Sequence, residues 1–330
     1  MRILERLEQL AALGDRIGYS AGEDRAHELA AGWFREAGLD VEVDAAGNLI
    51  GRVPGGLRQV WTGSHLDTVP GAGRFDGTLG VVAGLEAVER LGTPGLGVVV
   101  FRDEERGCAG SRGCAARPDA YVELHIEQGP TLLRADAPVG IVTGIVGYVR
   151  GRRTFDGTAG HAGTTPMDAR DDALVAAAEF VLAARSAARA IDGAVATVGR
   201  VTVEPGGTNV IPGRVVVSVD ARAPDAARLD RLVARLHVEE PVRTEPAPMS
   251  NEIRDALGAA AAAVGAPVLE LPSGAGHDAG ILAAAGIPAG MLFVRSLNGG
   301  VSHHPDELSS PEDIALATDV LAGALKRLVA

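Results

Sequence analysis

Cysteine and lysine are almost absent from this 330-residue chain, which has two cysteines and one lysine, Lys326. Cys108 and Cys114 are six residues apart, a pattern that provides neither a disulfide framework nor the spacing of a common zinc knuckle. The remaining basic residues are arginines, a bias that we attribute, together with the abundant alanine and glycine, to coding preference. A reduced, cytoplasmic setting is expected.

Long apolar runs are also lacking. The longest, residues 256–271, is interrupted by Gly265 and Pro267 and is too short to span a bilayer. The first six residues are charged and amphipathic, unlike a signal peptide. A net charge of -12 argues against nucleic acid or an anionic membrane as the main partner. The balance of 46% hydrophobic and 22% charged residues is typical of a folded protein with one large or two ordinary domains.

The first 125 residues alternate between helical and strand patterns. Helical periodicity covers residues 3–18, 23–37 and 77–91, and strands are predicted at 41–43, 49–53, 60–63, 96–101 and 121–124. The last three strands each lead into polar residues. Because open α/β sheets bind ligands at the carboxyl ends of their strands, we expect these polar residues to form a site.

A different pattern begins near residue 138. Strands are predicted at 145–155, 195–203, 214–220 and 238–244, with helices at 169–188 and 225–236. This β-α-β-β-α-β order is that of a ferredoxin-like unit. We therefore predict an α/β protein: residues 1–137 and 249–330 form a domain with a mixed, mainly parallel sheet, and residues 138–248 form an inserted ferredoxin-like α+β domain. A helix at 251–264, a strand at 291–294 and a helix at 311–328 complete the first domain.

One stretch, residues 63–77, contains a histidine and two aspartates. His65 and Asp67 are two residues apart, so their side chains point the same way in an extended segment. A carboxylate beside a histidine fixes the tautomer and orientation of a metal-bound imidazole. Asp76 follows in a glycine-rich loop before a helix, a position from which a carboxylate can bridge two cations. The alternative is that these residues only satisfy turn and helix-cap hydrogen bonds.

Two adjacent acids, Glu104 and Glu105, follow the predicted strand at 96–101. Neighbouring residues of an extended loop face opposite ways, so one carboxylate can bind a metal while the other acts as a general base. The alternative is a solvated acidic pair, and their place after a buried strand favours the functional interpretation.

Two histidines complete the candidate set. His125 ends its strand, where the neighbouring carboxylates favour a metal ligand over a core histidine. The second is His303 or its neighbour His304, and the residues alone leave that choice open. Taking His303, we predict one metal site from His65, His125 and Asp76, and another from Glu105, His303 and the same Asp76. Three protein ligands per ion leave room for a bridging water, as catalysis requires, and the mixed N/O donors suit Zn, Mn, Co or Ni.

With these residues in view, the chain resembles the M20 metallopeptidase superfamily. Within it, the match is to the amidase/hydantoinase/carbamoylase subgroup, which includes N-carbamoyl-L-amino acid hydrolases and allantoate amidohydrolases. The matching segments are GSHLDTVPGAGRFDG (63–77), DEE (103–105), ELHIEQGP (123–130), GHAGTTPMD (160–168), NVIPG (209–213), VDAR (219–222), SGAGHDA (273–279) and GVSHHPDE (300–307). ELHIEQGP and GHAGTTPMD are particular to this subgroup.

The resemblance implies a role for each candidate residue on a zinc-exopeptidase-like catalytic domain. The implied metal ligands are His65, Asp76, Glu105, His125 and His303, and the implied cofactors are two divalent ions, with Zn expected and Mn, Co or Ni possible. Asp67 would hold the ligand His65, and Glu104 would be the general base. The implied substrate contacts are Gln128, His161, Asn209, Arg222 and His277, with His161 also polarising the scissile carbonyl. The inserted domain would act as a lid and would pair in a homodimer.

The implied activity is hydrolysis of a linear N-carbamoyl or ureido C–N bond in a small carboxylate-bearing substrate, by metal-activated water. An aminopeptidase or dipeptidase of the same superfamily is the alternative within enzymes. A shortened, non-catalytic binding relative is the other alternative, because only nineteen residues separate Glu105 from His125, where the family usually has many more.

Overall fold

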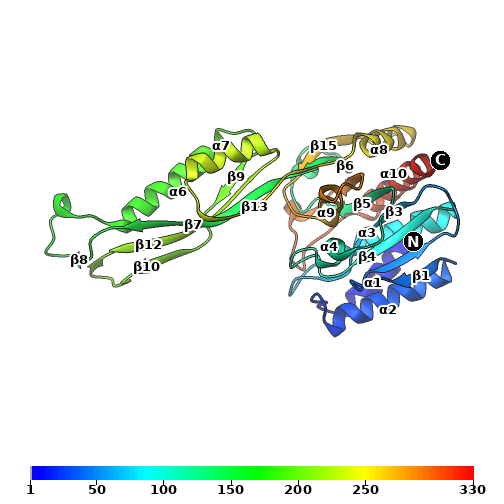
Figure 1. Cartoon of the computed structure of the whole chain (residues 1–330), viewed down its shortest axis with the longest axis horizontal. Coiled ribbons are helices and arrows are strands. Elements are labelled where there is room, and N and C mark those ends of the chain that lie inside the picture. Colours follow the sequence, from blue (N-terminus) through cyan, green and yellow to red (C-terminus); the bar gives the residue numbers. More distant parts are fainter. Residues whose placement is uncertain (1) are drawn as a thin grey trace. The chain divides into compact units, whose positions relative to one another are not determined.

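A computed structural model describes residues 2–330 and divides the chain into two compact units (Figure 1). The first unit comprises residues 1–145 and 247–330, and the second comprises residues 146–246. The sequence placed the insertion at 138–248. The second unit begins later because residues 139–145 form a strand of the first unit's sheet.

The first unit is built on a nine-stranded mixed sheet in the order β1-β2-β4-β3-β5-β16-β6-β14, with β15 also paired to β6. Its strands are β1 (Asp40–Val43), β2 (Leu49–Arg52), β3 (Val60–His65), β4 (Leu96–Phe101), β5 (Ala120–Ile126), β6 (Val139–Ile145), β14 (Ala247–Pro248), β15 (Val268–Ser273) and β16 (Ala289–Val294). The central neighbours β4, β3, β5 and β16 are parallel. They are buried on both faces, as continuous apolar runs require.

Helices cover both faces of this sheet. They are α1 (Arg2–Ala11), α2 (Ala21–Glu36), α3 (Thr78–Leu91), α4 (Ala109–Gly113), α5 (Thr131–Arg134), α8 (Asn251–Ala263), α9 (Asp278–Ala284) and α10 (Pro311–Val329), with a short 3-10 turn at η2 (Asn298–Gly300). Alternate residues of β4 separate two cores: Val98 and Val100 pack with α3 and α10, whereas Val99 and Phe101 pack on the side of α9. Among residues 2–330, no helix is both long enough and apolar enough to cross a bilayer.

Two expectations for the first unit need correction. The first helix ends at Ala11 rather than at residue 18, because Gly14 adopts a positive φ of 71° and Arg16 turns its side chain into the interior. Strands β6 and β15 and helix α9 were not predicted. In β6, glycines and a threonine interrupt the apolar pattern, so the segment resembles a linker in sequence.

The second unit is an antiparallel sheet in the order β10-β12-β7-β13, with β9 also paired to β12. Its elements are β7 (Gly147–Asp156), β8 (Gly160–His161), η1 (Met167–Ala169), α6 (Ala173–Arg189), β9 (Val195–Thr197), β10 (Val201–Glu204), β11 (Val210–Ile211), β12 (Arg214–Ala223), α7 (Ala226–Leu236) and β13 (Glu239–Thr244). This connection order confirms the ferredoxin-like prediction. The predicted strand at 195–203 is broken into β9 and β10.

The strand ends of the first unit meet as predicted. In the parallel ladder His65 is opposite Phe101, and His125 is opposite Phe293. The ends of β3, β4, β5 and β16 therefore lie at one edge of the sheet, and the loops that follow them supply the candidate site.

Candidate metal centre and substrate-binding residues

Asp67 links the end of β3 to the loop that follows β4. Its Oδ1 accepts the backbone N–H of Glu104 and its Oδ2 accepts that of Glu105, both at 3.1 Å. His65 Nδ1 lies 3.3 Å from Asp67 Oδ1 and 3.1 Å from the Asp67 carbonyl oxygen. With Nδ1 donating to these oxygens, Nε2 is left as the acceptor atom of the ring. Asp67 therefore orients His65 and, at the same time, places the two glutamates.

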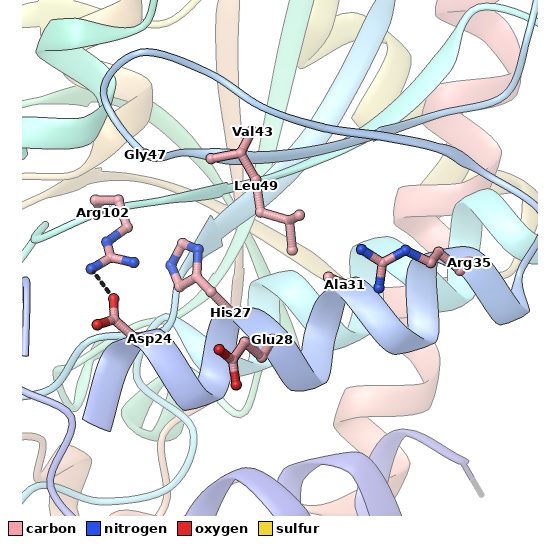
Figure 2. Close-up of a pocket in the computed structure, with 9 residues that line it drawn as sticks. All are labelled: Asp24, His27, Glu28, Ala31, Arg35, Val43, Gly47, Leu49 and Arg102. Carbon is pink, nitrogen blue, oxygen red and sulfur yellow. Dashed lines mark hydrogen bonds and ion pairs between the residues drawn. The ribbon is translucent and has the colours of Figure 1, made fainter. Parts of the chain in front are cut away.

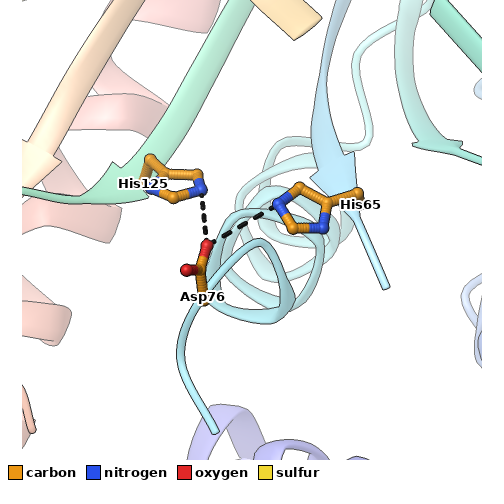
Figure 3. A group of neighbouring side chains, drawn as sticks. All are labelled: His65, Asp76 and His125. Carbon is orange, nitrogen blue, oxygen red and sulfur yellow. Dashed lines mark ion pairs between the residues drawn. The ribbon is translucent and has the colours of Figure 1, made fainter. Parts of the chain in front are cut away.

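Asp76 lies at the centre of the site. Figure 3 shows its side chain facing two histidines, His65 at the end of β3 and His125 on β5. Asp76 Oδ1 is 3.2 Å from His125 Nε2 and 3.7 Å from His65 Nε2. Asp76 Oδ2 is 3.3 Å from His303 Nε2, which is in turn 3.4 Å from Glu105 Oε2. The two carboxylate oxygens of Asp76 thus face two different groups of potential ligands.

These residues fit two cations. Each trio, His65–Asp76–His125 and Asp76–Glu105–His303, brings its ligand atoms within 4.8 Å of one another. Metal–ligand bonds of about 2.0–2.2 Å in tetrahedral geometry place neighbouring ligand atoms about 3.3–3.6 Å apart, close to the spacings observed. In residues 2–330 no arginine or lysine forms an ion pair with either acid of these trios. The buried Glu105 Oε1 also has no hydrogen-bond partner there.

The neighbouring acids and imidazoles shift one another's pKa values. Burial alone would lower the pKa of His65, but Glu104, Asp67 and Asp76 raise it well above its ordinary value. Burial would raise the pKa of Asp76, yet the surrounding histidines hold it well below its ordinary range. Burial raises the pKa of Glu105, against the charge of His65. The site therefore stabilises positive charge at its centre.

Glu104 and Glu105 divide as expected from their adjacency. The side chains are only 10% and 7% exposed, so they are not a solvated acidic pair. Glu105 faces His303, whereas Glu104 Oε2 lies 3.7 Å from His65 Nε2 and belongs to neither trio. Burial raises the pKa of Glu104 well above its ordinary value, against the charge of His65.

The choice between the two adjacent histidines is now clear. His303 adopts a positive φ of 56° and reaches Asp76 and Glu105. The side chain of His304 is 54% exposed and lies 3.6 Å from Asp306. Of the pair, only His303 is placed to be a ligand.

Gln128 and His277 both lie beside the trios. Gln128, at a positive φ of 56°, donates from Nε2 to Asp76 Oδ2 over 2.8 Å. The ring of His277 is buried 4.5 Å from that of His125, and its Nε2 is 2.9 Å from Ser273 Oγ. His277 precedes α9 but makes no helix-capping side-chain bond. It packs against the ring of His125, a candidate ligand.

In the second unit, the structure brings His161 and Asn209 together but not Arg222. The β8–β11 ribbon pairs His161 with Val210, and Ala162 N–H donates to the Asn209 carbonyl. Arg222 lies toward the other end of β12, eight residues beyond Arg214, or about 26 Å along an extended strand. Its guanidinium binds Asp220 at 2.8 and 3.2 Å.

Two hollows open on the first unit. One, of about 410 Å³, lies between α2 and the β1–β2 hairpin, where Arg102 pairs with Asp24 (Figure 2). Arg102 also pairs with Glu23, whose carboxylate accepts the Asp103 N–H. These contacts therefore connect α2 to the loop that carries Glu104. The second hollow, of about 360 Å³, is lined by Gln128 and by Leu271, Pro272 and Phe293, among others, and Gln128 connects it to Asp76 of the candidate metal centre.

Comparison with known proteins identifies the family. Residues 61–327 match the model of peptidase family M20/M25/M40. The chain is 38% identical to the N-carbamoyl-L-amino acid amidohydrolase of Geobacillus stearothermophilus, over 97% of this chain and 96% of that protein. It is 33% identical to the allantoate amidohydrolase of Bacillus subtilis (strain 168), over 88% and 87%. A hydantoinase/carbamoylase family amidase from Burkholderia multivorans superposes with a TM-score of 0.88 at 31% identity, covering 99% and 97%.

The chain belongs to peptidase family M20/M25/M40. The resemblance seen in its motifs is thereby confirmed, and the chain is a hydrolase acting on C–N bonds. The Geobacillus alignment spans 395 positions, 65 more than this chain has residues, so this M20 member is considerably shorter than that relative. In this chain the segment between Glu105 and His125 contains α4, a short connection and the first residues of β5.

Sequence reasoning missed four polar residues around the candidate centre. Glu123, Asp278 and Glu307 are buried, and Ser302 is half-buried. Glu123 accepts from Ser64 Oγ and the Ala279 N–H, so it ties β5 to β3 and α9. All four lie inside motifs already quoted for the family resemblance, but the contacts of Glu123, Ser302 and Glu307 join segments far apart in the sequence, which spacing does not reveal.

Proposed function

We propose that this chain is a binuclear metal-dependent amidohydrolase. Its substrate would be a small carboxylate-bearing molecule with a linear N-carbamoyl or ureido C–N bond, such as an N-carbamoyl-L-amino acid or allantoate. The observation that carries the proposal is Asp76, whose two oxygens face separate groups of ligand atoms. Relatives named for these two substrates support the substrate class.

His65 and His125 would hold one divalent ion and Glu105 and His303 the other, with Asp76 shared between them. Zn²⁺ is expected, and Mn²⁺, Co²⁺ or Ni²⁺ suits the same donors. When bound, such a pair of ions polarises a carbonyl and lowers the pKa of water. Asp67 keeps the His65 ring oriented toward the centre through its bond to Nδ1.

Glu104 is the proposed general base. It is buried beside His65, belongs to neither group of ligands, and is held by the bond from its own N–H to Asp67. From this position its carboxylate can take a proton from the attacking water and deliver it to the nitrogen as the C–N bond breaks. Glu104 ends the cycle ionised, as it began.

The substrate's carboxylate and carbonyl are proposed to be bound by the second unit. Arg222 suits a planar carboxylate because its guanidinium presents a fork of donors. His161 would polarise the scissile carbonyl, and Asn209 would share the carboxylate. Because Arg222 and the β8–β11 ribbon are far apart within one chain, we propose that one subunit supplies Arg222 and that His161 of the partner subunit completes the site.

Helix α6 offers a surface for that homodimer. Leu174, Val175, Val181 and Leu182 are 37–56% exposed and are spaced so that they lie on one face of the helix. An exposed apolar stripe of this kind marks an interaction site. Leu182→Glu should convert a dimer into a monomer in sedimentation experiments, whereas Glu179→Gln on the same helix should not.

The hollow beside Gln128 is proposed to receive the group next to the substrate's carboxylate. Its walls include Leu271 and Phe293, and the carboxylate of Glu127 is already bonded to the N–H groups of Thr131 and Leu132. The apolar part of this wall favours uncharged side chains, and the negative charge of Glu127 would repel acidic ones. Among N-carbamoyl amino acids, apolar residues should therefore be better substrates than acidic ones.

The test is an assay on protein reconstituted with Zn²⁺ or Mn²⁺, with bound metal measured after gel filtration. N-Carbamoyl-L-amino acids and allantoate are compared with dipeptides. Two metal equivalents and hydrolysis of ureido compounds support the proposal. Cleavage of dipeptides alone would identify a peptidase, and absence of both metal and turnover would identify a non-catalytic binding protein.

A further inference from the structure

We infer that Glu307, acting with Ser302, is the positioning residue that fixes Asp76 between the two ligand groups. The inference rests on the proposed role of Asp76 as the shared metal ligand. Glu307 is not one of the predicted ligands, and it contacts no atom of His65 or His125 in the hydrogen-bond and ion-pair network of residues 2–330. It would act only through the loop that carries Asp76.

The backbone at Asp76 is held by this carboxylate. Glu307 Oε1 accepts the N–H of Phe75 at 2.8 Å and that of Asp76 at 3.0 Å, across some 230 residues of sequence. The helix that follows provides no side-chain cap here, since the residue before α3 is Gly77, with a positive φ of 60°. A Cβ at Gly73 would lie 2.4–2.6 Å from Glu307 side-chain atoms, so the loop wraps directly around the carboxylate.

The side chain of Asp76 is held through Ser302. Ser302 Oγ is 3.1 Å from Asp76 Oδ2 and 3.0 Å from Glu307 Oε2. A hydroxyl has one proton, so Ser302 donates to one of these oxygens at a time and links the two carboxylates. Asp76 Oδ2 is the oxygen that faces His303, the next residue after Ser302. One glutamate thus sets the relative position of two proposed ligands.

A purely architectural role does not account for the charge of Glu307. The residue is 4% exposed, and in residues 2–330 it forms no ion pair with arginine or lysine. Burying a carboxylate without a paired cation is costly. A neutral acceptor could accept hydrogen bonds from the N–H groups of a loop. A carboxylate accepts several donors at once and also adds negative charge beside the proposed cation site.

The experiment is a metal titration that does not use activity. Metal-free parent, Glu307→Gln and Ser302→Ala proteins are titrated with Zn²⁺ against a chromophoric chelator, and their unfolding is measured without metal. Outer partners of metal ligands typically contribute 10–100-fold in affinity, so we expect such a loss for at least one ion in both variants. Because Asp76 is shared, we expect the two binding steps to weaken together rather than one alone.

Matched variants separate positioning from folding. Ser302→Thr keeps the hydroxyl and should restore binding relative to Ser302→Ala, and it serves if Glu307→Gln does not fold. Asp306→Asn removes an exposed neighbouring charge and should leave binding unchanged. Parent-like affinity in both Glu307→Gln and Ser302→Ala would overturn the inference while leaving the metal centre intact. A parent that binds no Zn²⁺ would overturn the metal centre and this inference together.

Discussion

The two units treat polar groups in opposite ways. Every buried polar or charged residue in the described chain lies in the first unit, from Arg6 to Thr318, and none lies between residues 146 and 246. The second unit buries apolar residues instead, among them four alanines of α6 and three leucines of α7. A buried charge must be compensated, so the first unit is organised around compensation. The second is an ordinary sheet and two helices that leave their polar side chains accessible.

This difference fits two kinds of work. Polar side chains that are held in a fixed, buried network are preorganised to bind cations and to transfer protons. Their electrostatic interactions are stronger because water is excluded. Exposed groups such as His161 can meet a substrate that arrives from solution. The buried polar groups of the first unit and the exposed ones of the second can be tested separately.

The largest expected effect is on the chemistry of the first unit. Glu104→Gln should lower turnover of the best ureido substrate by about 10²–10⁴-fold, because the amide cannot accept the water's proton. Bound metal should remain at the parent's stoichiometry, since Glu104 belongs to neither ligand trio. Measured kcat and metal content decide the matter. Parent-like turnover with both ions bound would remove Glu104 from the mechanism.

The second prediction concerns the substrate groups of the second unit. Arg222→Ala and Asn209→Ala should each impair activity severely. If the two residues act from different subunits, a random mixture of the two inactive variants, dissociated and reassociated, should regain up to about a quarter of the sites, since one site in each mixed dimer is intact. No recovery, with mixed dimers demonstrated, would mean that both residues act within one subunit.

Much of this site could be predicted from sequence for one physical reason. Parallel strands bring their carboxyl ends to one edge, so polar residues after three apolar runs had to converge, and His65, Glu105 and His125 do. The ferredoxin-like order was equally predictable, because its strands and helices carry clean periodic patterns.

The rest depends on contacts that leave no local pattern. Glu307 matters through two backbone N–H groups more than 230 residues away, and any residue type except proline can provide those. Strand β15 contains two polar residues and a proline, so its pairing with β6 depends on the rest of the sheet. Arg16 has the spacing of a continuing helix, but its side chain is bonded to carbonyls of the interior instead.

The third prediction compares the same substitution in both units. Buried Arg16 donates to the carbonyls of Leu66 and Leu10 and to Thr78 Oγ1, so Arg16→Met would leave several buried acceptors unsatisfied. We expect a loss of about 3 kcal/mol or more in the stability of the first unit. Trp33 and Trp61 both lie in that unit, so tryptophan fluorescence during urea unfolding reports on it.

The matched variant is Arg152→Met in the second unit. Arg152 is half exposed and pairs with an exposed glutamate, Glu240. Exposed pairs contribute about 0–1 kcal/mol, so the change in circular-dichroism unfolding should be small. Equal losses for the two arginines would contradict the contrast between a polar interior and a polar surface.

The smallest expected effect is the pH dependence contributed by His27, on the wall of the hollow in Figure 2. Burial, reinforced by the charge of Arg102, lowers the pKa of His27 to about 3, against the opposing charges of Asp67 and Asp24. In the unfolded chain this histidine takes up a proton below its ordinary pKa of about 6.5, whereas the folded chain does so only near 3. The unfolded state therefore binds more protons, and stability falls as the pH falls through that window. Between pH 7 and pH 5 the loss from this one residue is about 2 kcal/mol, at about 1.4 kcal/mol per pKa unit.

His27→Leu, which fills similar apolar space without titrating, should reduce the loss of first-unit stability over this range by that amount in fluorescence-monitored urea unfolding. His304→Gln, at an exposed histidine, should leave the pH dependence as in the parent. Identical slopes for His27→Leu and the parent would mean that His27 can gain a proton in the folded chain, where Glu23 lies 3.9 Å from its Nε2.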